Sequence, residues 1–487
     1  MRGRIIGALA AAVIGISVCL GGCQSAEQTK VRLDPKNPTV VVVWHYYNGT
    51  QKKAFDDMVT QFNESVGQEQ GIIVEAYSQG NVNELMDKVV DAANGKVGTD
   101  PLPQIFAAYG DTAYAVDALG KVADLDPYMT QQEQQAYVQA YLDEGRFDAQ
   151  ESLKIFPVAK STEVFMLNAT DWEPFAQATG ASKDDLATWE GLTRVAKAYY
   201  EYTDAQTETP NDGKAFFGRD AMANYMLVGL MQQGVEIFKV ENGKASLQLD
   251  EAAVRKLWDA YYSPYIRGYF GAYGRFRSDD AKTGDIIALV GSTSGAAYFP
   301  SEVVVSDTQS YTIQAEVMPP PVFEGGDKVA VQQGAGMVVA KGTPEEELAS
   351  VTFLKWFTEG ARNTDFSIVS GYMPVTQAAC TEESLQAGIT RIQSGETSEN
   401  LLKTLPVALE VTNAYRLYTS KPFGKGAEAR DVLEHALQDQ AQADREQVIT
   451  LLGQGVSLEE ASAQFDSDEQ FAKWYTAFTE ALEQAMN

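Results

Sequence analysis

The sequence predicts an α/β protein of two halves, followed by a helical C-terminal region. Short runs of apolar and β-branched residues alternate with amphipathic segments, and this alternation occurs twice along the chain. Such alternation is typical of a parallel sheet whose strands are joined by crossover helices. A chain of 487 residues is also long enough to form two domains with separate cores.

The first half opens with a strand predicted at residues 39–43, whose sequence TVVVV is typical of a strand buried on both faces. Residues 71–77 and 104–108 predict two more strands, and residues 82–93 predict an amphipathic helix between them. A helix is also expected after the first strand, because apolar side chains recur there at spacings of three and four, at Phe55, Met58, Val59 and Phe62.

The second half repeats the pattern with different content. Its predicted strands are residues 163–168, 286–290, 311–318 and 336–340, and its predicted helices are residues 189–202, 221–233 and 251–262. From Pro344 onward the pattern is almost entirely helical and ends in a helix at residues 467–486. Two α/β halves with a helical tail fit this length better than one large sheet.

The N-terminal residues predict an exported lipoprotein. Arg2 and Arg4 precede an apolar stretch at residues 5–20, as in a secretory signal peptide. A membrane-spanning anchor is the alternative, but this stretch is shorter than the ~20 residues that a spanning helix needs. The segment Leu20-Gly21-Gly22-Cys23 resembles a bacterial lipobox. We therefore expect a signal peptide at residues 1–22 and a flexible tether at residues 23–38, lipidated at Cys23.

The net charge of −29 and the cysteine content restrict the possible functions. Nucleic-acid binding needs a basic face that displaces counterions, so nucleic acid is not expected as a partner. The charge also disfavours anionic substrates and anionic lipid surfaces. Beyond Cys19 and Cys23, the chain has only Cys380, so no intramolecular disulfide is expected after export.

Side chains suited to catalysis are scarce. The chain has two histidines, His45 and His435, whereas a zinc site needs three or four His or Cys ligands, so we expect no metal and no cofactor. The segment from Gly291 to Gly295 has Thr293 where the G-x-S-x-G nucleophile motif requires serine. We therefore expect that the chain is not an enzyme. A lipid-anchored glycoside hydrolase stays open as an alternative, marked by carboxylates at the ends of eight barrel strands.

Six segments carry a resemblance to a known family. They are Trp44-His45-Tyr46-Tyr47-Asn48-Gly49; Pro103-Gln104-Ile105-Phe106 before Tyr109-Gly110-Asp111; residues 156–163 (FPVAKSTE); Thr188-Trp189-Glu190; residues 284–289 (GDIIAL) before Gly295; and residues 353–357 (FLKWF) before 371–375 (GYMPV). Together and in this order they resemble family 1 extracellular solute-binding proteins, which include maltose-, other oligosaccharide- and glycerol-3-phosphate-binding members.

The resemblance implies a two-lobe, class II fold like that of periplasmic binding proteins, with the ligand in a cleft between the lobes. We expect lobe 1 at residues 39–158 and 313–357, lobe 2 at residues 159–312 and 358–487, and crossings near residues 158–162, Tyr311 and Trp356. The implied partners are a small-molecule carbohydrate and the membrane permease subunits of an ABC importer with its cytoplasmic ATPase. A monomer is expected, held by its lipid on the outer face of the cytoplasmic membrane (facing the periplasm in a Gram-negative source).

Candidate ligand-binding residues follow from the chemistry of sugars and from the resemblance. Ligands of open α/β sheets bind at the carboxyl ends of strands, and aromatic rings and polar groups suit the apolar faces and hydroxyls of a sugar. Trp44 has core packing as an equal alternative, Asp111 has capping of the following helix, and Asn224 lies in a stretch that faces the cleft in the family. The candidates are Trp44, Tyr46, Tyr47, Asn48, Tyr109, Asp111, Ser161, Thr162, Phe217, Arg219, Ser294, Gly295, Gly334 and Tyr372.

The expected ligand is a neutral mono- or oligosaccharide. Glycerol-phosphate binders of this family hold the phosphate with an arginine ahead of the C-terminal helical region. In this chain the corresponding residues 421–426 (KPFGKG) offer only lysines, which lack the bidentate fork of arginine. A glycerol-3-phosphate or related polyol-phosphate binder is therefore the second alternative.

Overall fold

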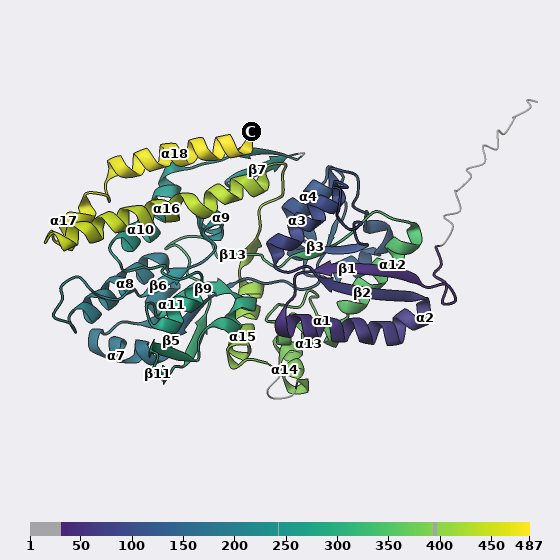
Figure 1. The fold of residues 1–487 in the computed structure, drawn as a ribbon, viewed down its shortest axis with the longest axis horizontal. Coiled ribbons are helices and arrows are strands. Elements are labelled where there is room, and N and C mark those ends of the chain that lie inside the picture. Colours follow the sequence, from purple (N-terminus) through teal and green to yellow (C-terminus); the bar gives the residue numbers. More distant parts are fainter. Residues whose placement is uncertain (1–30, 242, 393–396) are drawn as a thin grey trace, which may run out of the picture. The chain divides into compact units, whose positions relative to one another are not determined.

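The computed structural model describes residues 31–241, 243–392 and 397–487 (Figure 1). All helices and strands below lie in one compact unit, Leu33–Asn487. The predicted signal peptide, Cys23 and residues 24–30 of the predicted tether lie outside the described residues. Within the described residues, no helix combines the length and the apolar character needed to cross a membrane.

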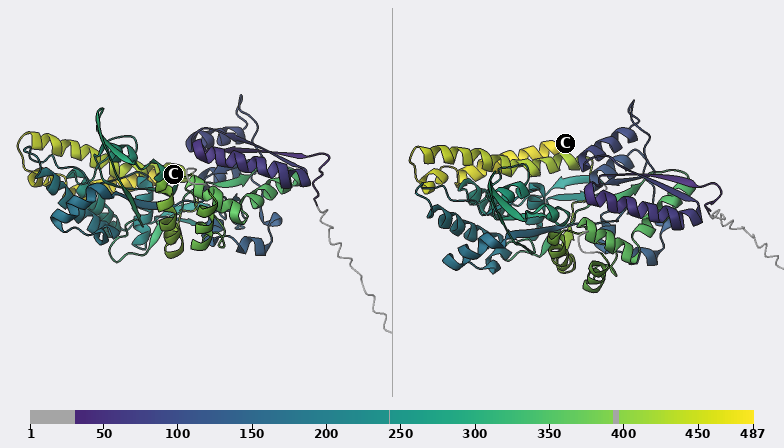
Figure 2. Two further views of the ribbon diagram at one scale, coloured as in Figure 1. Left: turned by 90° about the horizontal axis from the view of Figure 1, so that it is seen from below. Right: turned by 60° about the horizontal axis from the view of Figure 1, so that its bottom comes forward.

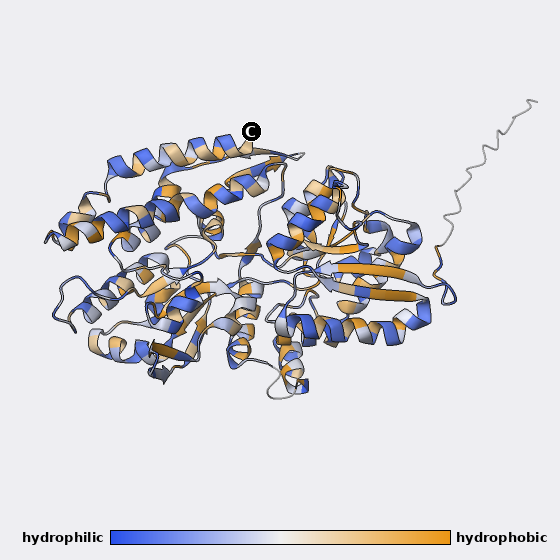
Figure 3. Cartoon of the chain, viewed as in Figure 1, coloured by the Kyte–Doolittle hydropathy of each residue, from blue (hydrophilic) through white to orange (hydrophobic). Residues whose placement is uncertain are grey.

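The first lobe is built around a five-stranded sheet in the order β2-β1-β3-β14-β4. β1 runs parallel to β2 and to β3, as the sequence predicted, whereas β14 is antiparallel to β3 and β4. Figure 3 shows β1 and β2 as largely hydrophobic strands. The strands are β1 Thr39–His45, β2 Ile72–Ser78, β3 Ile105–Ala108, β4 Ile155–Phe156 and β14 Gly336–Val339.

Helices pack on this sheet and complete the first core. α1 buries the four apolar side chains that the spacing predicted, and α3 has the predicted bounds. α12 and α13 join this core although they come late in the chain. The helices are α1 Gly49–Phe62, α2 Gln68–Gln70, α3 Val82–Ala93, α4 Gly110–Asp117, α5 Gln131–Gln135, α6 Gln139–Asp143, α12 Pro344–Phe357 and α13 Gly360–Ser370.

The second lobe is built around a four-stranded sheet in the order β12-β5-β9-β6. β5 is antiparallel to both of its neighbours, and β6 is parallel to β9. β5 has the predicted bounds. The strands are β5 Glu163–Asn168, β6 Phe217–Arg219, β9 Ala288–Ser292 and β12 Ala315–Met318.

An aromatic-rich core joins this sheet to the C-terminal helices. Trp258 of α10 stacks on Tyr262 and contacts Trp474 of α18, and α16 packs against α9 and α10. Figure 2 shows α16 and α18 (yellow) running beside each other in both views. The helices are α7 Ala169–Thr179, α8 Trp189–Asp204, α9 Met222–Gln232, α10 Glu251–Ile266, α11 Arg277–Thr283, α15 Glu399–Ala414, α16 Gly426–Gly453, α17 Leu458–Ala463 and α18 Asp468–Met486.

Short elements complete the molecule. A 3-10 helix follows β9 at Thr293–Tyr298, and α14, Glu382–Arg391, packs on α13. Three two-stranded pairs are antiparallel β7 Phe238–Glu241 with β8 Lys244–Leu247, antiparallel β10 Glu302–Ser306 with β11 Gln309–Thr312, and parallel β13 Val329–Val331 with β15 Arg416–Tyr418.

Three chain segments cross between the lobes side by side. The first, residues 157–162, joins β4 to β5, where the sequence placed a crossing. Ser161 exchanges backbone hydrogen bonds with Gln333, and Lys160 does so with Met373. Gly334 lies at a φ of +88°, and a Cβ there would stand 2.7 Å from the carbonyl oxygen of Ala159. Glycine is therefore required where the crossings approach each other.

The other two crossings differ from the expected positions near Tyr311 and Trp356. Residues 311–318 were expected to form one strand, but β11 and β12 are separate, and β12 pairs with β5 of the second sheet. The chain therefore returns to lobe 1 between β12 and β14. α13 contributes Phe366 to the first core, so the last crossing follows it. A helical pattern shows which face is apolar but does not show which core that face meets.

Candidate functional site

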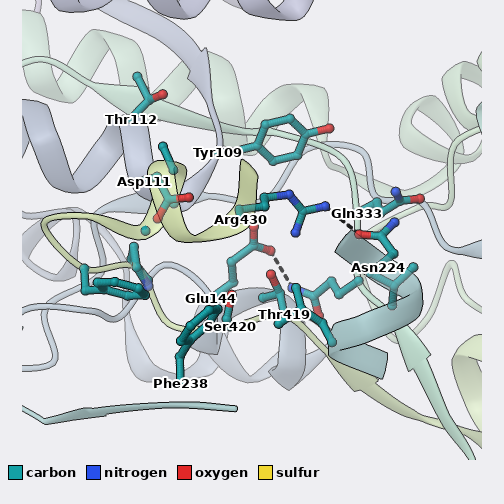
Figure 4. Close-up of a pocket in the computed structure, with 18 of the residues that line it drawn as sticks. Tyr109, Asp111, Thr112, Glu144, Asn224, Phe238, Gln333, Thr419, Ser420 and Arg430 are labelled. Carbon is teal, nitrogen blue, oxygen red and sulfur yellow. Dashed lines mark hydrogen bonds between the residues drawn. The ribbon is translucent and has the colours of Figure 1, made fainter. Parts of the chain in front are cut away.

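A cavity of about 450 Å³ is lined by residues of both lobes and of the crossing segments (Figure 4). Lobe 1 contributes the start of α3, the N-terminal turn of α4 and Glu144. Lobe 2 contributes α9, the segment from β15 to α16, and Phe238. The polar and aromatic lining residues are Asn83, Tyr109, Asp111, Thr112, Glu144, Asn224, Phe238, Gln332, Gln333, Tyr418, Thr419, Ser420, Phe423, Arg430, Asp431 and Glu434.

Tyr109 and Asp111 enter the cavity because β3 ends directly before them. β3 is a fully buried strand, and α4 begins at Gly110, so the residues between them stand at the carboxyl edge of the sheet. The Tyr109 side chain remains 37% exposed. Its ring offers an apolar face to the cavity, as a bound sugar requires.

Asp111 lies against the second lobe. Burial raises the pKa of its carboxyl to about 6, with Arg430 opposing the shift and Glu428 adding to it. A Cβ on Gly426, the first residue of α16, would stand 2.3 Å from Asp111 Oδ1. Glycine at this position therefore lets the carboxylate approach the N-terminus of α16, where the helix dipole favours negative charge. Asp111 lies inside the first turn of α4, whose N-cap is Tyr109.

A buried ion pair lies beside the crossings. Lys160 Nζ is 2.5 Å from Glu144 Oε2 and also donates to the carbonyl oxygen of Gly334, at 2.6 Å. The amide of Gln332 donates to the same Glu144 oxygen. Among the described residues, Glu144 Oε1 has no hydrogen-bond partner, and Glu144 lines the cavity. One acceptor of this carboxylate is thus available to a ligand.

Two further polar atoms of the cavity lining lack partners. Gln333 Oε1 and the Tyr418 hydroxyl are buried and make no hydrogen bond with any described residue. A buried polar group without a partner costs about 1–3 kcal/mol. Such atoms next to a cavity are typical of a site that is completed by a ligand or by ordered water.

The charges of the lining are unequal. Among the described residues, the lining holds four carboxylates, those of Asp111, Glu144, Asp431 and Glu434, and one guanidinium, that of Arg430. Lys160 offsets Glu144. Arg430 donates to Asn224 Oδ1 at 2.6 Å, and Glu434 accepts the backbone N–H of Ala223. The cavity therefore keeps a surplus of negative charge around a single arginine.

Some of the predicted site residues meet at the crossings. The hydroxyls of Tyr46 and Tyr372 lie 3.1 Å apart, and Ser294 Oγ lies 3.3 Å from Ser292 Oγ. Ser161 Oγ lies 2.8 Å from Thr293 Oγ1. None of these residues lines the cavity. Ser161 joins the first crossing to the segment that follows β9, and Tyr46 meets Tyr372 at the first core.

Other predicted site residues have structural contacts. Trp44 and Tyr47 are buried in the first core and Phe217 in the second. Asn48 donates its amide to the carbonyls of Tyr46 and Gly80, and Arg219 pairs with Glu163. Gly334 lies at the crossings as described above. Thr162 is buried there, and its Oγ1 makes no hydrogen bond with any described residue. The backbone N–H of Gly295 donates to Ser292.

The structure also brings an arginine to the cavity close to the segment 421–426, where the sequence offers only lysines. Arg430 lines the cavity four residues beyond the segment 421–426, whereas neither Lys421 nor Lys425 does. The sequence predicted a helical region around Arg430 but did not show which face of that helix meets the cleft. Glu144, Gln333, Thr419 and Ser420 were likewise missed, because no local pattern marks a loop residue that folds onto a distant cavity.

Comparison with known proteins identifies the family. The chain matches the family model of bacterial extracellular solute-binding proteins over residues 57–390, and it therefore belongs to this family. A search of curated protein sequences finds no match. The five-stranded and four-stranded sheets are not closed barrels, and the described residues hold no cluster of His, Cys, Asp and Glu suited to a metal ion.

Solved structures share the fold over nearly the whole chain. The cyclic α-maltosyl-1,6-maltose binding protein from Arthrobacter globiformis has a TM-score of 0.66 and 17% identity, and the match covers 92% of this chain and 99% of that one. UgpB from Mycobacterium tuberculosis, in complex with glycerophosphocholine, has a TM-score of 0.65 and 17% identity, covering 93% and 100%. The ABC substrate-binding protein Lmo0181 from Listeria monocytogenes, in complex with cycloalternan, has a TM-score of 0.61 and 15% identity, covering 91% and 100%. At these identities the likeness concerns the fold alone.

Proposed function

We propose that this chain is the substrate-binding component of an ABC importer and that it captures a neutral mono- or short oligosaccharide in the cavity between its lobes. It would deliver this sugar to membrane permease subunits that work with a cytoplasmic ATPase. Membership of the solute-binding family supports the role in transport. The cavity of about 450 Å³ falls in the range of ~300–1,000 Å³ that is usual for small-molecule sites.

The hydrogen-bond acceptors of the cavity that lack a partner are the observation that supports a sugar as the ligand. Glu144 Oε1 and Gln333 Oε1 can only accept hydrogen bonds, and the Tyr418 hydroxyl can accept or donate one. A sugar hydroxyl satisfies such atoms because it donates one hydrogen bond and accepts others. The surplus of carboxylates disfavours a doubly charged phosphate monoester at the same place.

A glycerophosphodiester or polyol phosphate is the second candidate, and Arg430 is the observation that favours it. Its guanidinium is the one cationic group among the described residues that line the cavity, and arginine suits phosphate oxygens. The structurally similar UgpB was solved in complex with glycerophosphocholine. A diester carries a single negative charge and would meet less repulsion from Asp111 and Glu434 than a monoester.

We propose further that the ligand is bound and not transformed, and that the protein is a monomer anchored through a lipid on Cys23. The family and the fold of its solved relatives support a binding role. Leu20-Gly21-Gly22-Cys23 supports the anchor. Replacing Cys23 by Ala should release the protein from the membrane fraction, and a variant that stays there and still incorporates labelled lipid would contradict the anchor.

A thermal-shift screen tests the proposal as a whole. The panel would hold neutral mono- and oligosaccharides, glycerol-3-phosphate and glycerophosphocholine, because a ligand at 100 times its Kd stabilises the folded state by about 2.7 kcal/mol. A shift with a neutral sugar alone supports the first candidate, and a shift with a phosphate compound alone supports the second. Mass spectrometry of the recovered sugar should show it unchanged, and turnover would favour the glycoside hydrolase.

A further inference from the structure

Four polar side chains form a continuous line of hydrogen bonds from the cavity into the second lobe. Arg430 of α16 donates to Asn224 Oδ1 at 2.6 Å, and Asn224 Nδ2 donates to Glu163 Oε1 at 2.8 Å. Arg219 Nη2 donates to both oxygens of Glu163, at 3.0 and 3.1 Å. Arg430 and Asn224 line the cavity, and Figure 4 shows the bond between them.

The inner end of this line is rigidly held. Arg219 and Glu163 are only 3% and 7% exposed. Arg219 lies on β6 and Glu163 on β5, and both strands pair with β9. Arg219 also donates to the carbonyl oxygens of Asp220 and Ala221, and its guanidinium carbon lies 5.9 Å and 5.4 Å from the ring centroids of Trp189 and Tyr225. A buried ion pair with these added contacts does not reorient readily.

The chemistry of the line fixes the orientation of Asn224. Arginine has no acceptor and a carboxylate has no donor, so the amide oxygen must face Arg430 and the amide nitrogen must face Glu163. Asn224 is 1% exposed. Aspartate at this position would place a second carboxylate against Glu163, and alanine would leave both neighbours unsatisfied.

Arg430 itself has few other partners. Among the described residues, its bond to Asn224 is the one hydrogen bond it makes. Without that bond, its long side chain would sample several rotamers in the cavity. With it, one Nη2 hydrogen is engaged while Nε–H and the Nη1 hydrogens remain available to a ligand.

We propose that Asn224, anchored by the Glu163–Arg219 pair, is a positioning residue that holds the Arg430 guanidinium in one orientation for recognition of two adjacent ligand oxygens. Neighbouring sugar hydroxyls or the two free oxygens of a phosphodiester both present such a pair. The part of this inference that concerns the ligand rests on the proposed function. The orientation of Arg430 can be measured without any ligand.

The first experiment examines the unliganded protein. In protein labelled with ¹⁵N-arginine, the Nε–H signal of Arg430 is assigned by its loss in Arg430→Lys. We expect Asn224→Ser to broaden this signal and to accelerate its hydrogen exchange at least tenfold. Gln232→Ala is the matched control, because Gln232 is a buried amide on the same helix, hydrogen-bonded to Val329 and Phe323 and outside the cavity. An Arg430 signal that is unchanged in Asn224→Ser, or equally changed in Gln232→Ala, would overturn the proposal.

The second experiment is a double-mutant cycle on binding, with maltotriose and glycerophosphocholine as probes. If Asn224 acts through Arg430, Asn224→Ala should weaken binding at least tenfold in the presence of Arg430 and less than twofold in the Arg430→Ala background. Independent, multiplicative losses would contradict the positioning role. If neither probe nor any sugar of the panel binds, the proposed function fails, while the arginine signal still decides whether Asn224 positions Arg430.

Discussion

The two walls of the cavity are built in different ways. The wall from lobe 1 presents Tyr109 and Asp111, which directly follow a buried strand of a largely parallel sheet. The wall from lobe 2 presents Asn224 and Arg430, which lie on two helices and are fixed by hydrogen bonds to a buried ion pair. The first wall is positioned by sheet topology and the second by a polar network. A substitution should therefore affect the lobe 1 wall locally and the lobe 2 wall through the network.

Breaking the anchor of the lobe 2 wall should have the largest effect. Glu163→Ala leaves Arg219 charged, buried and unpaired, and removal of one partner of a buried pair costs ~3–5 kcal/mol. Urea unfolding should show this loss in the free energy of unfolding. Glu316→Ala is the control. Glu316 lies on β12 of the same sheet, is partly exposed and pairs with Lys183, so its loss should cost less than about 1 kcal/mol. Equal losses for the two variants would contradict the network.

Asp111→Asn should have opposite effects on stability and on binding. The folded-state pKa of about 6 lies above the ordinary value of 3.8, so ionised Asp111 destabilises the folded state, and stability is lost as pH rises through that window. The variant should therefore match the wild type near pH 3.5 and exceed it at pH 7, by at most about 3 kcal/mol. Its affinity for sugar should fall at pH 7. Unfolding curves at both pH values and calorimetric titration would measure this, and a variant that is less stable at pH 7 would contradict the account.

Arg430→Ala should weaken binding while leaving the fold intact. A hydrogen bond to a charged group contributes ~1.5–3 kcal/mol, which corresponds to a ten- to more than hundredfold loss of affinity. Lys425→Ala is the control at the start of the same helix, because Lys425 is exposed, pairs with Glu428 and does not line the cavity. If isothermal titration gave the two variants the same affinity, Arg430 would not contact the ligand.

Tyr372→Phe should have the smallest effect. It removes only the hydroxyl that meets Tyr46, and such a bond is worth ~0.5–1.5 kcal/mol. The affinity should change no more than a few fold, because Tyr372 does not line the cavity. A loss of binding as large as that of Arg430→Ala would instead indicate that the ligand binds near Tyr46, Tyr47 and Tyr372, which the sequence analysis named as candidates.

Some elements and site residues of the two lobes could be predicted from the sequence, and others could not. Strands β1 and β5 carry short, nearly continuous apolar runs, and helices α1 and α3 carry apolar side chains at a period near 3.6, so their existence and position could be predicted. Tyr109 and Asp111 could be proposed because they follow a strand. Arg430 and Glu144 could not, since a helical or loop segment does not reveal which distant surface its polar side chains meet.

A position near the end of a strand also did not suffice to identify a residue of the ligand site. Trp44 lies near the end of β1 and Tyr47 follows that strand, as Tyr109 follows β3, but both side chains are buried in the first core. Aromatic side chains supply apolar area to cores and to sugar sites alike, so their type does not distinguish the two roles. Only the packing of α1 and α13 around Tyr47 decides between them.

Hydrogen–deuterium exchange with and without the best sugar of the panel tests the central claim that one ligand bridges both walls. A ligand that bridges both walls should increase protection in three separate segments, at residues 109–117, 222–232 and 426–434, in the same experiment. Protection limited to one lobe, or confined to the region around Tyr46, Ser294 and Tyr372, would contradict it.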